Sequence, residues 1–153
     1  MLWCVPQQLR VTKVSTVVWP ERRFVAQKST GLTVLVVDDD FSALSLLGIM
    51  LQREGHLAIK ATDAHEALAS LSQGTPDLIV LDLMMPGIDG IRLATILRQR
   101  TDTATTPILM LSSLVDEDVI QRGLQAGAND FLEKPILHPD LISKVKKLVT
   151  NRK

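Results

Sequence analysis

The chain has 153 residues, enough for one domain and little more, and its 17 basic and 17 acidic residues leave no net charge. This balance argues against a strongly basic nucleic-acid-binding protein, and 46% hydrophobic residues is too high for a disordered chain. A single Cys excludes an intrachain disulfide, no apolar run reaches the roughly 18 residues of a membrane-spanning helix, and the N-terminus lacks the layout of a signal peptide. We therefore expect a cytoplasmic protein.

Charge divides the chain into two parts. Residues 1–31 hold five basic residues and one acidic residue, a net charge of +4, and residues 32–153 carry the opposite net charge of −4. We therefore divide the chain into a basic N-terminal leader, 1–31, and a domain, 32–153. Residues 11–19 of the leader are rich in β-branched side chains. Three interpretations stay open: a flexible arm, an added strand or docking segment, or an upstream extension from a misassigned start.

Within the domain, short apolar runs alternate with segments of helical spacing. The predicted strands are Thr33–Val37, Leu57–Lys60, Leu78–Leu81, Ile108–Leu111 and Asp130–Glu133. The predicted helices are a segment around Leu44–Leu51, then Ala64–Gln73, Ile91–Arg100, Asp116–Ala126 and a C-terminal segment with Pro139 in its first turn. Asp63 and Glu66 have the spacing of a capping box, with Asp in the Ser/Thr role.

Five alternating strand–helix units predict an α/β fold with a parallel sheet covered on both faces. We expect a flavodoxin-like, doubly wound, five-stranded parallel sheet of order 2-1-3-4-5 with five helices. In such folds the ligand site lies at the carboxyl ends of the strands.

Polar residues follow four of the five predicted strands. In chain order they are Asp38, Asp39 and Asp40, then Asp82, then Ser112 and Ser113, and finally Lys134 before Pro135. Carboxylates so close together repel one another, and a divalent cation removes that penalty. Oxygen ligands favour Mg²⁺ or Mn²⁺ over Zn²⁺. A carboxylate beside such a metal and a Lys can attack phosphorus to form an aspartyl phosphate.

Four motifs in this order closely resemble the receiver domain of two-component response regulators, over about residues 32–150. They are Val-Val-Asp-Asp-Asp ending at residue 40, Leu-Asp-Leu-Met-Met-Pro-Gly-Ile-Asp-Gly at 81–90, Pro-Ile-Leu-Met-Leu-Ser-Ser at 107–113 and Gly-Ala-Asn-Asp-Phe-Leu-Glu-Lys-Pro at 127–135. The resemblance implies that Asp82 is the phosphoacceptor. It also implies that Asp38 and Asp39 organise Mg²⁺ together with Asp82 and the backbone carbonyl of Met84.

The same resemblance assigns roles to residues of the last two motifs. Lys134 matches the Lys that meets the phosphoryl group, and its bond to Pro135 is typically cis in the family. Ser112 matches the switch hydroxyl, and Phe131 matches the switch aromatic. The family commonly has Thr as the switch hydroxyl residue and Tyr or Phe as the switch aromatic residue. Because Phe131 has no hydroxyl, we expect no output that depends on a Tyr hydroxyl.

Several other polar residues fit simpler structural roles. Asp40 fits the N-cap of a helix that starts near residue 41, and Asp89 fits a turn that ends at Gly90. The three histidines, at positions 56, 65 and 138, have no clustered spacing and fit surface or capping positions.

We expect a stand-alone receiver, because the chain ends at Lys153, just past the fifth predicted helix, and leaves no room for a DNA-binding output domain. Its expected partners are a histidine kinase or phosphotransfer protein and a downstream protein target, without direct nucleic-acid contact. By the same resemblance it is not an enzyme, although it assists its own phosphotransfer and dephosphorylation. Oligomeric state stays open.

Two rival hypotheses remain. One is a phosphatase with an Asp nucleophile on a related fold, but those enzymes place a second Asp two residues after the nucleophile, where this chain has Met84. The other is a protein-interaction module that has lost phosphorylation, against which the complete set of Asp38, Asp39, Asp82 and Lys134 argues.

Overall fold

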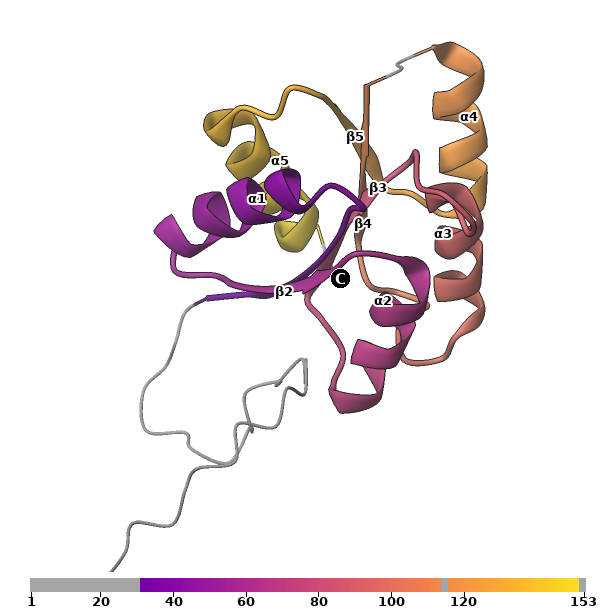
Figure 1. Cartoon of the computed structure of the whole chain (residues 1–153), viewed down its shortest axis with the longest axis horizontal. Coiled ribbons are helices and arrows are strands. Elements are labelled where there is room, and N and C mark those ends of the chain that lie inside the picture. The colour runs from indigo at the N-terminus through magenta and orange to yellow at the C-terminus, as the bar shows by residue number, and fades with distance from the viewer. Residues whose placement is uncertain (1–30, 114–115, 152–153) are drawn as a thin grey trace, which may run out of the picture.

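The computed structural model describes residues 31–113 and 116–151 (Figure 1). The strands are β1 (Thr33–Val37), β2 (Leu57–Ala61), β3 (Leu78–Asp82), β4 (Ile108–Ser112) and β5 (Asp130–Glu133). The helices are α1 (Phe41–Arg53), α2 (Ala64–Ser70), α3 (Gly90–Gln99), α4 (Glu117–Ala126) and α5 (His138–Thr150), with a short 3₁₀ helix, η1 (Leu71–Gln73), after α2. The interpretations of the leader fall on residues 1–30, which lie outside the described residues.

The strands form one parallel sheet of order β2-β1-β3-β4-β5, which confirms the predicted topology. All carboxyl ends therefore lie along the same edge of the sheet. β3 and β4 each extend one residue further than predicted, so Asp82 and Ser112 are the last residues of strands and not the first residues of loops. Their backbones are consequently held by the sheet.

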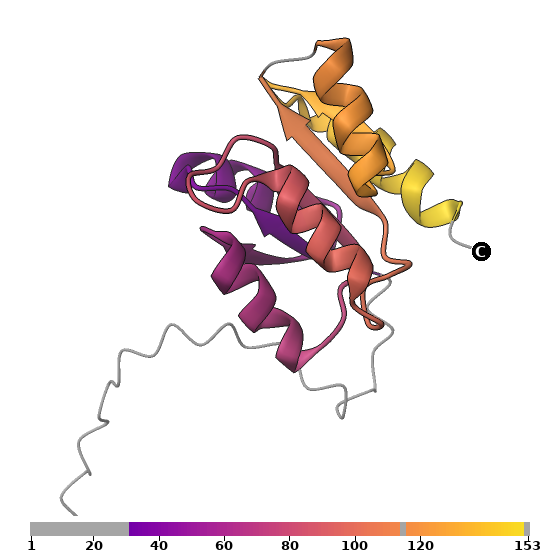
Figure 2. The same ribbon diagram turned by 90° about the vertical axis from the view of Figure 1, so that its right-hand side faces the viewer.

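Helices cover both faces of the sheet, α1 and α5 on one side and α2, α3 and α4 on the other (Figures 1 and 2). Every residue of β3 and β4 is buried, as the near-continuous apolar runs indicate. Alternate strand residues enter the two cores: Val34 and Val36 lie in the core under α1 and α5, and Leu35 and Val37 in the other. In the described parts of the chain, no helix is both long and apolar enough to cross a membrane.

Acidic residues cap the first four helices. The side chains of Asp40, Asp63, Asp89 and Asp116 accept hydrogen bonds from the backbone N–H of Ser42, Glu66, Arg92 and Val119, respectively. Asp40 thus has the expected capping role, and Asp89 caps α3.

Two local predictions need correction. The helix predicted over Ala64–Gln73 ends at Ser70, and its last three residues form η1. The capping box is only half formed, because the Glu66 carboxylate accepts from the N–H and hydroxyl of Thr62 and not from the N–H of Asp63. A carboxylate on this flexible side chain reaches one residue further back, where two donors are available.

Candidate functional site

Asp82 ends the middle strand of the sheet, where the residue is only 4% exposed. The backbone of the next residue, Leu83, is also held by hydrogen bonds. The Leu83 N–H donates to the Leu111 carbonyl at 2.9 Å, and the Leu83 carbonyl accepts from Gly90 N–H at 3.0 Å. A Cβ atom on Gly90 would overlap the carbonyl oxygen of Asp82. Glycine at this position therefore lets α3 begin directly against the backbone that carries Asp82.

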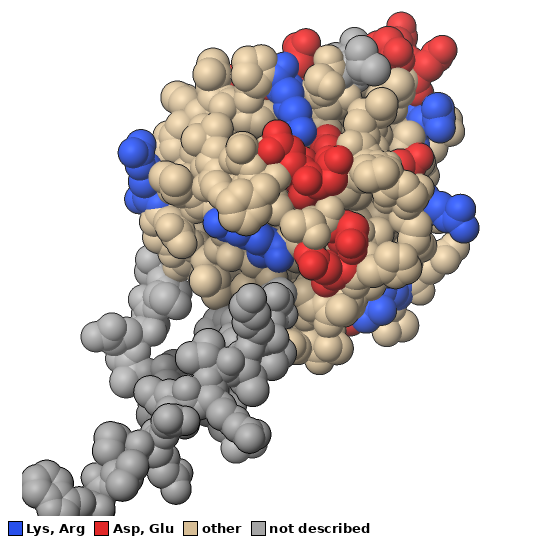
Figure 3. Space-filling model, in the orientation of Figure 1, with Lys and Arg blue, Asp and Glu red and all other residues tan. Residues whose placement is uncertain are grey.

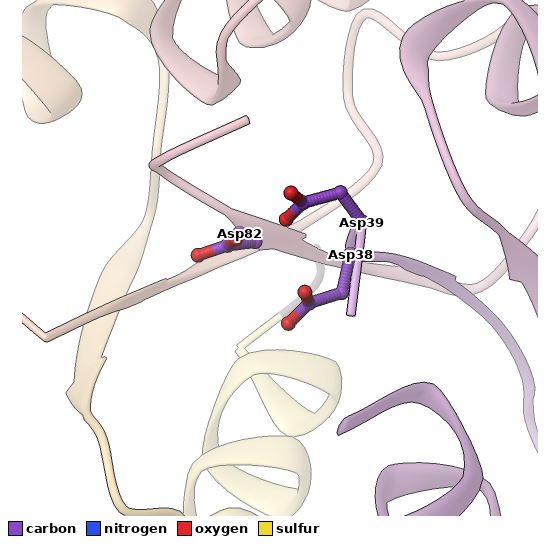
Figure 4. A group of neighbouring side chains, drawn as sticks. All are labelled: Asp38, Asp39 and Asp82. Atoms are coloured by element: carbon purple, nitrogen blue, oxygen red, sulfur yellow. The ribbon is translucent and has the colours of Figure 1, made fainter. Parts of the chain in front are cut away.

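Asp38 and Asp39 follow β1, the strand beside β3, and the structure brings both to Asp82. One carboxylate oxygen from each of the three residues lies within 4.8 Å of the others (Figure 4). Asp38 is buried and Asp39 is exposed. The Asp38 carboxylate accepts from Asp40 N–H at 2.9 Å, which fixes its orientation. Three oxygen ligands from two adjacent strand ends could hold a metal ion such as Mg²⁺, which prefers carboxylate oxygen and keeps waters in its shell.

Lys134 follows β5, and its ammonium joins the carboxylates. Its Nζ lies 2.9 Å from Oδ2 of Asp38 and 3.3 Å from Oδ1 of Asp82. Its backbone N–H donates to the carbonyl of Ser112 at 2.9 Å, and its peptide bond to Pro135 is cis, as expected. The backbone of Lys134 is therefore fixed against β4 while its side chain reaches the site.

The charges at the site are unevenly compensated. Burial raises the pKa of the Asp82 carboxyl, and the Asp38 charge raises it further, while Lys134 and the N–H of Met84 oppose the shift. Burial alone would lower the pKa of Lys134, but its contacts with Asp38 and Asp82 outweigh burial and raise it. Lys134 is thus protonated among three carboxyl groups, and the site retains an excess of negative charge that favours a cation. Acidic side chains also gather near the middle of the face seen in Figure 3.

The structure places Ser112 and Phe131 on the face of the sheet that α4 covers. Ser112 ends β4 and is buried. Met110, two residues earlier and hence on the same face, pairs in register with Phe131, and both pack in the core under α2, α3 and α4. The Met84 side chain is exposed, and the residue follows Asp82 closely enough for its N–H to contact the Asp82 carboxylate.

Sequence reasoning missed Arg98, which lies in the last turn of α3. Its guanidinium donates to several acceptors beyond that helix: the carbonyls of Thr103, Ala104, Thr106 and Gly127 and the side-chain oxygen of Asn129. Asn129 Oδ1 also accepts from Ile108 N–H at 2.8 Å. Arg98 therefore joins α3 to the segments that lead into β4 and β5. The only signal in the sequence was a basic residue near the C-terminal end of a predicted helix, and such a residue predicts no more than a favourable interaction with the helix dipole.

Comparisons with known proteins agree with this architecture. The chain matches the family described as the response regulator receiver domain over residues 34–146. It is similar to the transcriptional regulatory protein PrrA of Mycobacterium tuberculosis, with 41% identity over 126 residues, covering 80% of this chain and 53% of PrrA. It is also similar to the phosphate regulon transcriptional regulatory protein PhoB of Pseudomonas aeruginosa, with 35% identity over 116 residues, covering 76% of this chain and 51% of PhoB. The chain thus spans about half the length of the curated relatives it matches.

Solved structures show the same likeness. The chemotaxis protein CheY4 of Vibrio cholerae is 30% identical with a TM-score of 0.75, covering 77% of this chain and 98% of CheY4. The receiver domain of the Francisella response regulator 1452 is 35% identical with a TM-score of 0.73, covering 80% of this chain and 100% of that domain. The fold, the order of the strand-end residues and the family match together place this chain among the receiver domains of two-component response regulators.

Proposed function

We propose that this receiver accepts a phosphoryl group on Asp82 from a phosphohistidine of a partner histidine kinase or phosphotransfer protein. The observation that carries the proposal is the position of the Asp82 carboxylate, which lies 3.3 Å from the Lys134 ammonium and beside Asp38 and Asp39. A nucleophilic carboxylate at the end of a buried strand has a fixed backbone, and its charge is stabilised from one side by Lys134.

The proposed transfer follows from this geometry. A carboxylate oxygen of Asp82 attacks phosphorus, and the P–N bond to the donor imidazole breaks. The electron pair of that bond stays on the ring nitrogen, which takes a proton from water, so the donor side chain leaves as a neutral imidazole. Lys134 stabilises the charge on the phosphoryl oxygens as a point charge.

A divalent cation fits the remaining negative charge. We propose that Asp38, Asp39, Asp82 and the backbone carbonyl of Met84 hold Mg²⁺, or Mn²⁺ in its place. When bound, the ion neutralises phosphoryl charge during transfer. The chemical character of the donor set supports this choice, since carboxylates and a carbonyl suit a hard cation.

We further propose that phosphorylation changes the arrangement of Ser112 and Phe131 and so alters the surface formed by α4, β5 and α5. The two residues support this role because both lie on the face of the sheet under α4. A downstream protein that binds this surface would then detect the phosphoryl group. We expect the protein to act in the cytoplasm as a signalling switch and not as an enzyme with a released product.

Labelling with acetyl phosphate tests the proposal. Wild type incubated with acetyl phosphate and Mg²⁺ should gain one phosphoryl group, detected by intact mass, and chelation of Mg²⁺ should abolish the gain. Asp82→Asn keeps the shape of the side chain and should remain unlabelled. Asp63→Asn, which changes a capping residue at α2 to another good capping residue, is the matched control and should be labelled like wild type.

The rival hypotheses give different results in this assay and in a parallel one that supplies a phosphoester. Labelling of Asp82→Asn at the wild-type rate would overturn the assignment of Asp82. Turnover of a phosphoester without a stable adduct would favour the phosphatase, and the absence of labelling in wild type would favour an interaction module that does not use phosphorylation.

A further inference from the structure

The first turn of α1 begins directly after two of the three carboxylates of the acidic site. Asp40 follows Asp38 and Asp39 in the chain and is the N-cap of α1. Its carboxylate accepts from Ser42 N–H at 2.8 Å, and its carbonyl accepts from Leu44 N–H at 3.0 Å. The helix therefore holds Asp40 through both its side chain and its carbonyl.

The backbone N–H of Asp40 makes a different contact, with the acidic site. It donates to Oδ1 of Asp38 at 2.9 Å, while Oδ2 of the same carboxylate accepts from Lys134 Nζ, also at 2.9 Å. Asp38 is fully buried, whereas Asp40 is exposed. A residue at the surface thus joins the start of a helix to a buried carboxylate of the candidate metal site.

The two partners of the Asp38 carboxylate differ in rigidity. Lys134 reaches it with an ammonium at the end of a flexible side chain, whereas the Asp40 N–H belongs to the backbone. That backbone group has a fixed position as long as the first turn of α1 is formed, and the cap stabilises this turn. Loss of a group that orients a metal ligand typically lowers metal affinity by roughly 10–100-fold.

We propose that Asp40 is a positioning residue of the metal site: its carboxylate caps α1 and so fixes the backbone N–H that orients Asp38. The inference rests on the proposed binding of Mg²⁺ by Asp38, Asp39 and Asp82. It gives Asp40 a role other than that of a further ligand, because the atom that reaches Asp38 is a backbone nitrogen. The role therefore depends on the capping oxygen at position 40 and not on its charge.

Substitutions at position 40 can separate the cap from the charge. Asp40→Asn and Asp40→Ser remove the charge and keep a side-chain oxygen that caps a helix well, whereas Asp40→Ala removes both. All three variants keep the N–H that touches Asp38, so only the support of this N–H changes. The difference between the Ala variant and the two capping variants therefore measures the cap alone.

Asp63→Ala is the matched control for the loss of a cap. The Asp63 carboxylate accepts from Glu66 N–H at 2.8 Å, which is the same kind of bond at the start of α2. This bond holds the first turn of α2 and not the acidic site. We expect Asp63→Ala to lower the melting temperature and to leave Mg²⁺ binding unchanged.

The experiment titrates the full chain with Mg²⁺ by calorimetry, for wild type and the four variants. Two further readouts need no metal: the melting temperature, and the hydrogen-exchange rate of the residue 40 amide by NMR, which reports its bond to Asp38. We expect Asp40→Ala to bind Mg²⁺ about fivefold more weakly than Asp40→Asn and Asp40→Ser, with faster exchange at residue 40.

The capping variants and the control should behave differently from Asp40→Ala. Asp40→Asn and Asp40→Ser should stay within about twofold of the wild-type affinity, because the charge that they remove is exposed and screened by salt. They should also keep slow exchange at residue 40. Asp63→Ala should match wild type in both Mg²⁺ affinity and exchange at residue 40.

Two results would overturn the inference. Equal Mg²⁺ affinity in the Ala, Asn and Ser variants would mean that the cap at position 40 has no influence on the metal site. A lower melting temperature of Asp40→Ala with wild-type exchange at residue 40 would mean that the cap supports α1 alone. Failure of the proposed function looks different, because then wild type binds no Mg²⁺, while the exchange rates still test whether the cap fixes the contact with Asp38.

Discussion

Lys134 Nζ lies 2.9 Å from Oδ2 of Asp38, although 96 residues separate the two in the chain and two strands separate β5 from β1 in the sheet. The Lys134 side chain spans this distance across the carboxyl end of β3, where it also meets Asp82. One ammonium therefore compensates two buried carboxylates from different strands.

Lys134→Ala leaves these two carboxylates without their cation. In the absence of Mg²⁺ we expect the variant to lose about 1–3 kcal/mol of unfolding free energy, since uncompensated buried charge is costly. Mg²⁺ should bind more tightly than in wild type, because a competing positive charge is gone, and should restore part of the stability. Denaturant unfolding with and without Mg²⁺ measures both effects. Lys146→Ala, an exposed residue of α5, is the control, and equal Mg²⁺ affinity in Lys134→Ala and wild type would contradict the prediction.

Gly90→Ala should disturb Asp82 through the backbone. The added methyl group would overlap the Asp82 carbonyl oxygen and lie 2.8 Å from Cα of Leu83, so α3 or the end of β3 must shift. We expect a loss of about 2–3 kcal/mol and slower labelling by acetyl phosphate. Gly55→Ala is the matched control: its φ of 80° is strained for Ala, but the space around it is open, so labelling should be unchanged. Equal labelling of the two variants would show that the Gly90 contact does not position Asp82.

Asp130 should contribute to stability in a pH-dependent way. Burial alone would raise the pKa of its carboxyl, but the hydrogen bond from Lys144, the Phe131 N–H and the charges of Lys144 and Lys147 outweigh burial and lower it. Because the folded-state pKa lies below the unfolded value, the contribution is complete above the unfolded pKa of about 3.9 and is lost as pH falls through the folded-state pKa. Urea unfolding should show wild type more stable than Asp130→Asn by about 1 kcal/mol at pH 7, with a smaller difference near pH 3. A difference independent of pH would contradict the pairing.

Arg98→Ala should destabilise the fold without touching the acidic site. It removes a charged donor from oxygen acceptors in the two segments that lead into β4 and β5, and we expect a loss of about 2–3 kcal/mol in unfolding free energy. Arg98→Lys should recover only part of it, because one ammonium cannot satisfy acceptors that the planar guanidinium reaches together. Arg92→Ala, an exposed position of the same helix, is the control. Equal stability of Arg98→Ala and Arg92→Ala would mean that the Arg98 contacts contribute nothing.

Removal of residues 1–31 tests the proposed domain boundary. Leu32 is tied to the start of β2: its N–H donates to Nδ1 of His56, and its carbonyl accepts from Leu57 N–H at 2.8 Å. We expect the 32–153 fragment to keep the wild-type melting temperature, Mg²⁺ binding and labelling. A fall of more than about 5 °C, on the order of 1 kcal/mol for a domain near this size, would show that the leader packs as part of the fold.

The sequence by itself determined the architecture and the residue types of the site. Alternation of apolar runs with helical spacing is a local property, and it predicts the βα order and hence the parallel sheet. In a parallel sheet all carboxyl ends share one edge, so the residues that follow each strand meet there. For this reason Asp38, Asp39, Asp82 and Lys134 could be grouped before their positions were known, and the structure brings all four together.

Tertiary structure decided which side chains touch. The acceptors of Arg98 are mostly backbone carbonyls, which every residue carries and which leave no trace in a sequence pattern. The fit of Phe131 against Gly123 depends on how closely α4 approaches the sheet, a distance set by packing across the whole core. Periodicity predicts which face of a helix is buried, but only the packed structure decides how much room that face leaves for a ring from another strand.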